Sequence, residues 1–372
     1  MCETHYLDHN ATSPLRASAV TAVEAALRVA GNGSSVHSYG RQARRVVEEA
    51  RQHVAKLCGA TSEMVTFTSG GTEANNLVLR GAGHDQVLMS AIEHPSVKEA
   101  REDGVIVPVT SDGVVDVIAL DTMLSFDSRP ALVSVMYANN ETGVVQPISR
   151  IAEIAKAHGA VFHCDAVQAA GKVPVNVSSF GADLLTISAH KIGGPAGSGA
   201  LINVTGVDLD ARTYGGGQEK KQRSGTENLI GIAGFGGAAQ ETHERGSADI
   251  VKAHGLRDRL ESELAEKMPQ IQVVGAGVER LGNTSFLLVP GVDSETLVMG
   301  LDLAGVAVSA GSACSSGTVK ASGVLLEMGY PESQARTAVR VSLGWSSTDH
   351  DVAAFVTALH PIYERAQRHI AA

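Results

Sequence analysis

Residues 162–168 (FHCDAVQ) and residues 188–191 (SAHK) set the architecture of this 372-residue chain and mark its chemistry. Each segment closes a short run of apolar and β-branched residues, and the two carry opposite charges on Asp165 and Lys191. The last residues of parallel strands meet at one edge of a sheet, which is where such sheets bind ligands. We therefore expect Asp165 and Lys191 to face the same cleft.

Outward from these segments, short β-rich runs alternate with helix-like segments such as residues 148–158. This alternation predicts an α/β fold in which a mostly parallel, seven-stranded sheet is covered by helices. The strands are expected over residues 65–68, 87–90, 105–109, 132–137, 161–164, 184–188 and 200–204.

Two helices are expected before the first of these strands. Ser13 followed by Pro14 predicts a helix start, and apolar residues at helical spacing continue until Gly31. A second, amphipathic helix is predicted over residues 39–57, with Gly59 just beyond its end.

The pattern changes near residue 250, where a long amphipathic helix is expected over residues 251–268. A smaller α+β unit is expected to follow. We therefore predict a large domain over residues 14–250 and a small domain formed by residues 1–13 and 251–372. The small domain is expected to hold strands over 271–274, 285–289 and 339–343, and helices over 295–303 and from 349 onward.

The overall composition excludes several classes of protein. With 44% hydrophobic and 19% charged residues the chain is an ordinary globular protein, and its net charge of −10 disfavours direct binding to nucleic acids or anionic membranes. No segment approaches the roughly 20 apolar residues of a membrane span, and the first residues lack a leader pattern, so a cytoplasmic protein is expected. Its four cysteines are too few and too widely spaced for a disulfide scaffold or a close metal-binding pair, so no metal site is predicted.

Residues 65–76 (VTFTSGGTEANN) predict an anion-binding turn. Here a strand leads through Gly70 and Gly71 into a helix start, where backbone N–H groups and the helix dipole favour a phosphate. A turn of this kind taken alone is more often an ordinary strand-to-helix loop. The segment is neither a Walker loop nor a GxGxxG fingerprint, so it does not indicate a nucleotide.

A lysine and a carboxylate at one sheet edge suit pyridoxal phosphate, which forms a Schiff base with lysine and needs a protonated pyridine nitrogen. Taken singly, Lys191 is more often a surface residue and Asp165 a helix cap. Together with the anion-binding turn they favour the cofactor. His94, in the segment EHP, would lie over the cofactor ring, although a lone histidine is more often structural.

Cys314 lies among small, flexible residues in SAGSACSSG, residues 309–317. Little in this segment would bury a thiol, which favours a nucleophile over a packing residue. Cys58 and Cys164 fit the role of core residues, and Cys2 lies at a terminus.

In this order the motifs resemble the cysteine desulfurases of the NifS and IscS type, within the class-V aminotransferase family of fold-type I pyridoxal-phosphate enzymes. The matching segments are spread over nearly the whole chain. They are YLDHNAT from Tyr6, SSVH from Ser34, FTSGGTEANN from Phe67, EHPSV from Glu93, NNETGVVQPI from Asn139, FHCDAVQ from Phe162, SAHKIGGPAGSG from Ser188, GGGQEKKQRSGTEN from Gly215, SAGSACSSG from Ser309 and VRVSLG from Val339.

The resemblance implies a role for each matching residue. Lys191 would hold the cofactor, Asp165 would pair with its pyridine nitrogen, Gln168 would bond its ring hydroxyl and His94 would stack on its ring. The phosphate would be bound by Gly71, Thr72, Ser188 and His190, and by Thr226 from the second subunit of a homodimer. The substrate would be bound by Asn140, also close to the cofactor, and by Arg340, with Asn10 and Arg223 at the rim.

The activity implied by the resemblance is removal of sulfur from L-cysteine. Lys191 would take the Cα proton, L-alanine would be released, and Cys314 would hold the sulfur as a persulfide for an acceptor protein. That acceptor would be an iron–sulfur cluster scaffold or a thiolation enzyme, and the short tail after Cys314 leaves the choice open.

Other functions are also compatible with these residues. A selenocysteine lyase shares the fold and the nucleophile. An aminotransferase or β-lyase would use Lys191, Asp165 and Arg340 but would have no use for Cys314. An inactive sulfur-relay subunit should have lost Lys191, Asp165 or Cys314, and all three are present.

Overall fold

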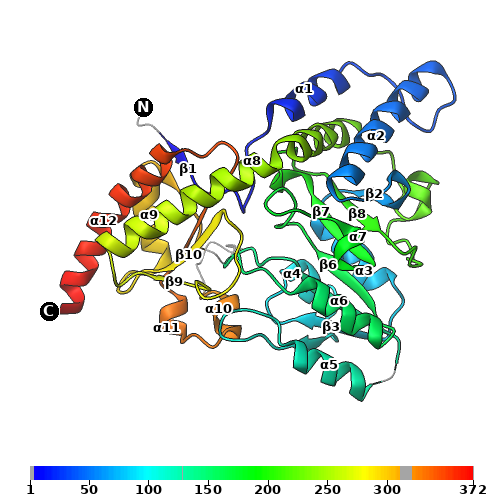
Figure 1. The fold of residues 1–372 in the computed structure, drawn as a ribbon. Coiled ribbons are helices and arrows are strands. Elements are labelled where there is room, and N and C mark those ends of the chain that lie inside the picture. The colour runs from blue at the N-terminus through cyan, green and yellow to red at the C-terminus, as the bar shows by residue number, and fades with distance from the viewer. Residues whose placement is uncertain (1–3, 128, 311–320, 372) are drawn as a thin grey trace.

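The computed structural model describes residues 4–127, 129–310 and 321–371. The elements form two parts that lie side by side, and the 39-residue helix α8 (Leu229–Lys267) runs along both of them (Figure 1). None of the helices in the described part of the chain combines the length and apolar character needed to cross a membrane.

The larger part is built on a seven-stranded sheet, as expected from the alternating pattern. Only β8 runs antiparallel to its neighbours, so the mostly parallel sheet is confirmed. In spatial order the strands are β2 (Val65–Thr68), β8 (Gly199–Asn203), β7 (Leu184–Ser188), β6 (Val161–Asp165), β5 (Ala131–Met136), β3 (Gln86–Ser90) and β4 (Val105–Val107).

Helices cover both faces of this sheet. Helix α3 (Gly71–Gly81) packs on one face, and the other face is covered by α2 (Ser38–Leu57), α5 (Val117–Phe126), α6 (Ile148–Ala157) and the first half of α8. Because side chains alternate along a strand, Cys164 enters the core under α6 while Asp165 lies on the α3 side. The remaining helical elements of this part are α1 (Ala17–Ala26), α4 (Pro95–Lys98), α7 (Val177–Phe180) and the 3₁₀ turns Ser62–Met64, Ala189–Lys191 and Gln218–Lys221.

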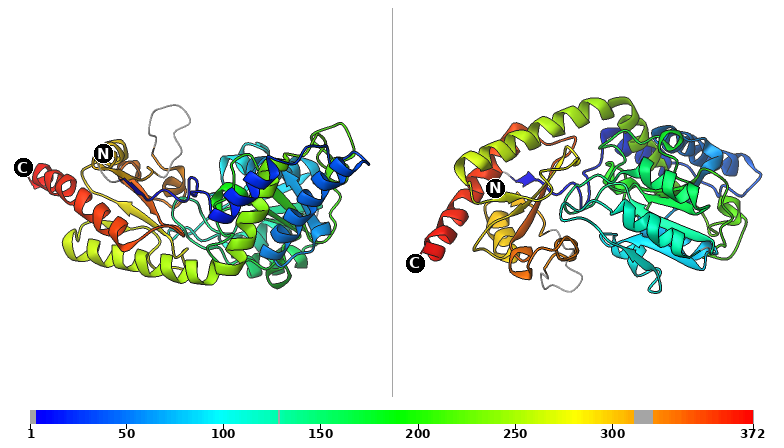
Figure 2. Two further views of the ribbon diagram at one scale, coloured as in Figure 1. Left: turned by 90° about the horizontal axis from the view of Figure 1, so that it is seen from above. Right: turned by 60° about the horizontal axis from the view of Figure 1, so that its bottom comes forward.

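The smaller part has its own hydrophobic core, formed between a three-stranded antiparallel sheet, the second half of α8 and two further helices (Figure 2). A short parallel pair joins the N-terminal segment to this part. The elements are β12 (Ala338–Ser342), β10 (Thr284–Leu288) and β9 (Gln272–Val273), the pair β1 (His5–Tyr6) and β11 (Val306–Ala307), and the helices α9 (Ser294–Leu303), α10 (Gly323–Glu327), α11 (Glu332–Ala335) and α12 (Asp349–Ala371).

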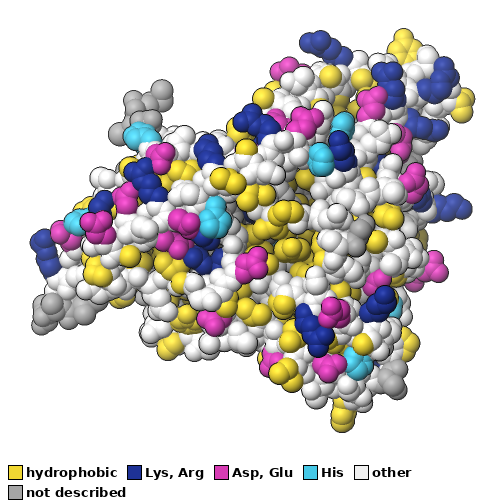
Figure 3. Space-filling view, in the orientation of Figure 1, with side chains coloured by type: hydrophobic (Ala, Val, Ile, Leu, Met, Phe, Trp, Pro, Cys, Tyr) yellow, Lys and Arg dark blue, Asp and Glu magenta, His cyan; other side chains and the backbone are white. Residues whose placement is uncertain are grey.

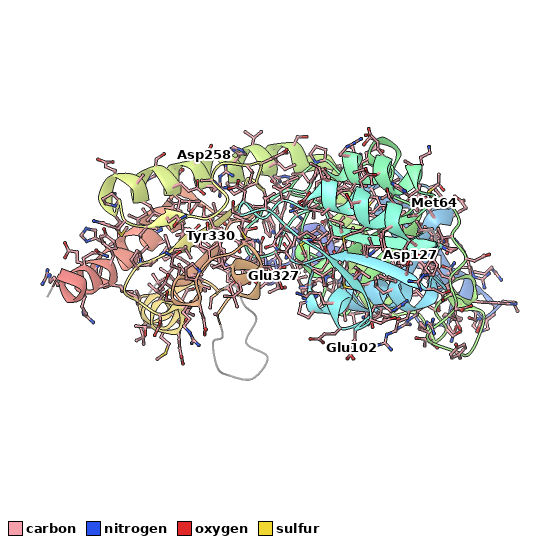
Figure 4. All side chains as sticks on the ribbon, turned by 90° about the horizontal axis from the view of Figure 1, so that it is seen from below. Met64, Glu102, Asp127, Asp258, Glu327 and Tyr330 are labelled. Carbon is pink, nitrogen blue, oxygen red and sulfur yellow. The ribbon has the colours of Figure 1, made fainter. Side chains whose placement is uncertain are left out.

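Side chains also link the two parts directly. Glu327 and Tyr330 lie in the smaller part, whereas Met64 and Asp127 lie in the larger one (Figure 4). The Glu327 carboxylate is 3.9 Å from Lys98 Nζ, which belongs to the larger part.

The expected helix over residues 251–268 is wrong at its start, because α8 begins at Leu229. Glycines such as Gly236 and Gly237 have low helix propensity, so residues 229–239 do not read as a helix. In the fold they allow close packing, since a Cβ on Gly236 would lie 2.6 Å from Ala50 Cα.

The first helix also starts later than expected. It begins at Ala17, and Ser13 does not cap it. Instead, the Ser13 N–H donates to the His190 carbonyl, and the Arg16 guanidinium donates to Ile192 O, Glu241 and Asp249. These contacts keep residues 13–16 extended against the larger part.

Three consecutive residues in the turn Gln218–Lys221 have left-handed backbone conformations, with φ of 44° at Glu219, 57° at Lys220 and 66° at Lys221. Such conformations strain residues that carry a Cβ. We expect Lys221→Gly to stabilise the protein by about 0.5–1 kcal/mol, measured as a rise in melting temperature. Lys156→Gly, within the right-handed helix α6, is the matched control. It should lower the free energy of unfolding by about 1 kcal/mol. Equal destabilisation by both substitutions would contradict the prediction.

Candidate active site

A cavity of about 450 Å³ opens at the carboxyl ends of the parallel strands. Its walls come from the N-terminal loop, the start of α3, the loops after β3, β5, β6 and β7, and from β12 of the smaller part. Eleven of the residues expected at the site line it: Asn10, Gly71, Thr72, His94, Asn140, Asp165, Gln168, Ser188, His190, Lys191 and Arg340. Apolar side chains gather in the hollow between the two parts, whereas charges of both signs are scattered over the face (Figure 3).

Two expected site residues that the structure describes are not among those that line the cavity. Arg223 Nε donates to Glu73 at 2.8 Å, and Thr226 is exposed. Cys314 lies outside the described residues. The chain before it reaches the cavity wall at Ser309, whose backbone N–H and C=O both bond to Arg340.

Asp165 is the last residue of β6, and its carboxylate is held at both oxygens. Oδ2 accepts from Asn75 Nδ2 at 2.7 Å, and Oδ1 accepts from the Val167 N–H at 2.9 Å. With both oxygens accepting, the group is oriented as a carboxylate acceptor. It can therefore stabilise a positive charge in the cavity.

Asn75 and Ser96 are cavity residues to which sequence reasoning gave no role. Asn75 Nδ2 also donates to Ser96 Oγ at 2.9 Å, and Ser96 Oγ lies 2.8 Å from His94 Nδ1. A hydrogen-bonded row thus runs from Asp165 to His94. The spacing in the sequence could have predicted Asn75 as a cavity residue, because it lies one helical turn after Gly71 and so faces the same side of α3.

His94 caps the short helix α4, and its Nδ1 accepts a hydrogen bond from the Ser96 N–H at 3.1 Å. This contact places the proton of the neutral ring on Nε2. Removal from bulk water lowers the pKa of His94, the Asp165 charge opposes this, and the Lys191 charge lowers it further. The ring is therefore held in its neutral form.

Lys191 follows β7 in a 3₁₀ turn, and its ammonium reaches the N-terminal loop. Nζ donates to Asn10 O at 2.6 Å and to Ala11 O at 2.8 Å. Burial lowers the pKa of Lys191 to about 8, the Arg340 charge contributes, and Asp8 and Asp165 oppose it. The amine is thus far easier to deprotonate than an ordinary lysine.

This shift predicts unusual nucleophilicity of Lys191 in the cofactor-free protein. With a pKa of about 8 instead of 10.5, about one tenth of the amine is neutral near pH 7, roughly 300-fold more than for an ordinary lysine. Because the neutral fraction rises with pH, labelling of Lys191 by a small aldehyde and borohydride should rise with a midpoint near pH 8. Peptide mass spectrometry would measure it, with the exposed Lys156 as control. Equal labelling of both lysines near pH 7 would contradict the prediction.

The anion-binding turn forms one wall of the cavity as expected. Helix α3 begins at Gly71, and a Cβ there would meet Val167 Cγ2 at 2.8 Å. Ser188 Oγ is buried and has no hydrogen-bond partner among the described residues. An unpartnered hydroxyl beside a helix N-terminus suits a bound phosphate oxygen.

Arg340 brings a positive charge from the smaller part into the cavity. It lies on β12, and its guanidinium donates to Asn140 O at 2.9 Å and to Asp8 Oδ1 at 2.7 Å. Asp8, for which the sequence predicted no role, orients this group. The fork keeps further N–H donors for a carboxylate.

The two described cysteines are core residues, as expected. Cys58 and Cys164 are both buried, and burial raises the pKa of Cys58 to about 12. Burial also raises the pKa of Cys164 well above its usual range. Across the ranges that the structure describes, no three His, Cys, Asp or Glu side chains group in a way that could hold a metal ion.

The family model of the class-V aminotransferases matches residues 5–355. The chain is 38% identical to cysteine desulfurase IscS of Dictyoglomus turgidum, with 97% of this chain and 94% of the relative covered. It is 41% identical to a cysteine desulfurase of Sinorhizobium fredii, with 93% of each covered. The solved structure of a NifS-like protein from Rickettsia africae superposes with a TM-score of 0.91 at 36% identity, covering 97% of this chain and all of that one. The chain therefore belongs to the class-V aminotransferase family, among the cysteine desulfurases of the NifS and IscS type.

Proposed function

We propose that this protein is a pyridoxal-phosphate-dependent cysteine desulfurase that converts L-cysteine and the Cys314 thiol into L-alanine and a Cys314 persulfide. The Cβ–S bond of the substrate breaks, an S–S bond forms on Cys314, and the electron pair left on the substrate carbon takes up a proton to give alanine. The observation that carries the proposal is the convergence of Asp165, Lys191 and Arg340 on one cavity. The names of the relatives supply the substrate.

The residues of the cavity fit pyridoxal phosphate. The unpartnered Ser188 hydroxyl and the start of helix α3 at Gly71 suit its phosphate, and the fixed Asp165 carboxylate suits its pyridine nitrogen. Lys191 would bind it covalently. The other residues that would hold it are Thr72, His94, Asn140, Gln168 and His190, with Thr226 supplied by the second subunit of a homodimer.

When bound, this cofactor accepts the electron pair left at the substrate Cα after proton removal. The side chains of the protein would move the proton and bind the substrate. Lys191 Nζ carries the proton, and its pKa of about 8 suits proton transfer near neutral pH. Arg340, oriented by Asp8 and Asn140, binds the substrate carboxylate. Asn10 and Arg223 would lie at the rim.

The sulfur held by Cys314 would pass to an acceptor protein, either an iron–sulfur cluster scaffold or a thiolation enzyme. Sulfur transfer of this kind requires direct contact between the attacking sulfur atom and the sulfur atom that it attacks. Cys314 would first contact the substrate sulfur and later the acceptor. Cys314 would therefore serve two partners, the substrate and the acceptor.

The test is product analysis with L-cysteine and a thiol reductant. Alanine and sulfide in equal amounts are expected. Pyruvate and ammonia would instead identify a β-lyase. A strong preference for selenocysteine would identify a selenocysteine lyase.

Asp165→Asn should lower alanine release by about 10²- to 10³-fold. The substitution removes the charge, and while Asn75 keeps its orientation the new amide nitrogen faces a donor, either Asn75 Nδ2 or the Val167 N–H. The matched control is Asp183→Asn, because the Asp183 carboxylate accepts from the Phe162 N–H at the opposite end of β6. Rate measurements in which both variants keep wild-type activity would contradict the role of Asp165.

A further inference from the structure

Lys172 is a half-buried lysine that the proposed chemistry does not use, yet it lies directly behind the cavity wall. Its Nζ donates to Gln168 Oε1 at 2.5 Å and to Asn10 Oδ1 at 2.8 Å. Gln168 and Asn10 both line the cavity. Lys172 therefore contacts the site through two amide side chains.

The two amides belong to a connected group. Gln168 Nε2 donates to Asn10 O at 3.0 Å, the same carbonyl that accepts from Lys191 Nζ at 2.6 Å. Asn10 Nδ2 donates to Thr284 Oγ1 at 2.9 Å. The orientation of the Gln168 amide thus affects the Asn10 carbonyl, which Lys191 also contacts.

An amide side chain can turn by half a rotation at little steric cost, which exchanges its oxygen and nitrogen. Lys172 opposes such a turn at Gln168, as does the Asn10 carbonyl, whereas the Asn10 amide is also held by Asn283, whose Nδ2 donates to Asn10 Oδ1 at 3.1 Å. An ammonium only donates, and even a neutral amine has two hydrogens for the two oxygens that it contacts here. Burial, followed by the charges of Lys191 and Arg340, holds the pKa of Lys172 well below its usual range.

With its oxygen turned to Lys172, Gln168 has only N–H groups left for the cavity. One of them bonds to Asn10 O, and the second is left for a ligand. The ligand atom opposite Gln168 must then be an acceptor. The ring oxygen of pyridoxal phosphate is such an atom, and a donor favours its deprotonated form.

We infer that Lys172 is a positioning residue that fixes the amide orientation of Gln168, so that Gln168 presents an N–H donor to the ring oxygen of the cofactor. This inference rests on the proposed function. It assigns Lys172 no contact with the substrate.

The test is a pH titration of the visible absorption of the cofactor-loaded protein. Lys172→Met should raise the pH at the midpoint of the absorption change by about one unit. This is the size expected when one hydrogen bond to a charged oxygen is lost. Lys172→Gln, whose amide can itself turn, gives a second variant and should shift it in the same direction. Lys172→Arg keeps a group that only donates and should restore the wild-type midpoint. Lys98→Met is the matched control, because Lys98 Nζ donates to Ala91 O outside the cavity.

A double-variant cycle separates orientation from charge. If Lys172 acts through Gln168, Lys172→Met should add less than about a third of its shift in a Gln168→Met background. A full shift in that background, or no shift in the wild-type background, would overturn the inference alone. Failure of the wild-type protein to take up pyridoxal phosphate would overturn both the inference and the proposed function.

Discussion

Replacement of Lys191 by alanine should lower alanine release from L-cysteine by about 10³- to 10⁴-fold, the largest effect expected from a side chain in the described cavity. The substitution removes the amine that we propose to hold the Cα proton and to bind the cofactor. It removes one donor from Asn10 O, which keeps its bond from Gln168 Nε2, and the donor to Ala11 O, which lies at a partly open site where water can replace it. The loss should therefore be catalytic and not a loss of folding.

Two further measurements make this prediction specific. Lys191→Arg keeps a positive charge, but a guanidinium does not deprotonate near neutral pH, so it should be as inactive as Lys191→Ala. A small primary amine added to Lys191→Ala should restore part of the rate. Retention of more than about a tenth of the wild-type rate by either variant would mean that another group removes the proton.

Cys314→Ser should abolish alanine and sulfide release while the spectrum of the bound cofactor stays normal. A serine hydroxyl is almost never ionised near neutral pH, so the loss should be at least about 10³-fold. Lys191 and Asp165, which we propose to hold the cofactor, are retained. Mass spectrometry of the wild-type protein after exposure to L-cysteine should find one added sulfur atom on Cys314.

Cys58→Ala is the matched control for this experiment. Cys58 is buried, and its pKa of about 12 keeps it a thiol. Its substitution should lower stability by about 1 kcal/mol and leave alanine release unchanged. Added sulfur on another cysteine, or an active Cys314→Ser variant, would contradict the proposed persulfide site.

The sheet and the main cavity residues could be predicted because local signals agree with the fold there. Each expected strand of the larger part is an apolar run, and Asp165 and Lys191 follow from their positions at strand ends. The family resemblance added Arg340, which lies on a strand of the other part and has no local signal of its own.

What the sequence did not reveal depends on contacts between distant segments. The row from Asp165 to His94 passes through Asn75, which comes from a helix 90 positions earlier than Asp165. Lys172 contacts Gln168 nearby in the sequence, but it also contacts Asn10, which lies 162 positions earlier in the chain. Polar residues of this kind look like surface positions until the chain is folded.

Helix α8 couples the unfolding of the two parts. Its 39 residues span about 58 Å, and its first half completes one hydrophobic core while its second half completes the other. If either core melted, half of the helix would lose its packing and fray toward the other core. We therefore expect a single cooperative calorimetric transition, although a chain with two cores could in principle show two.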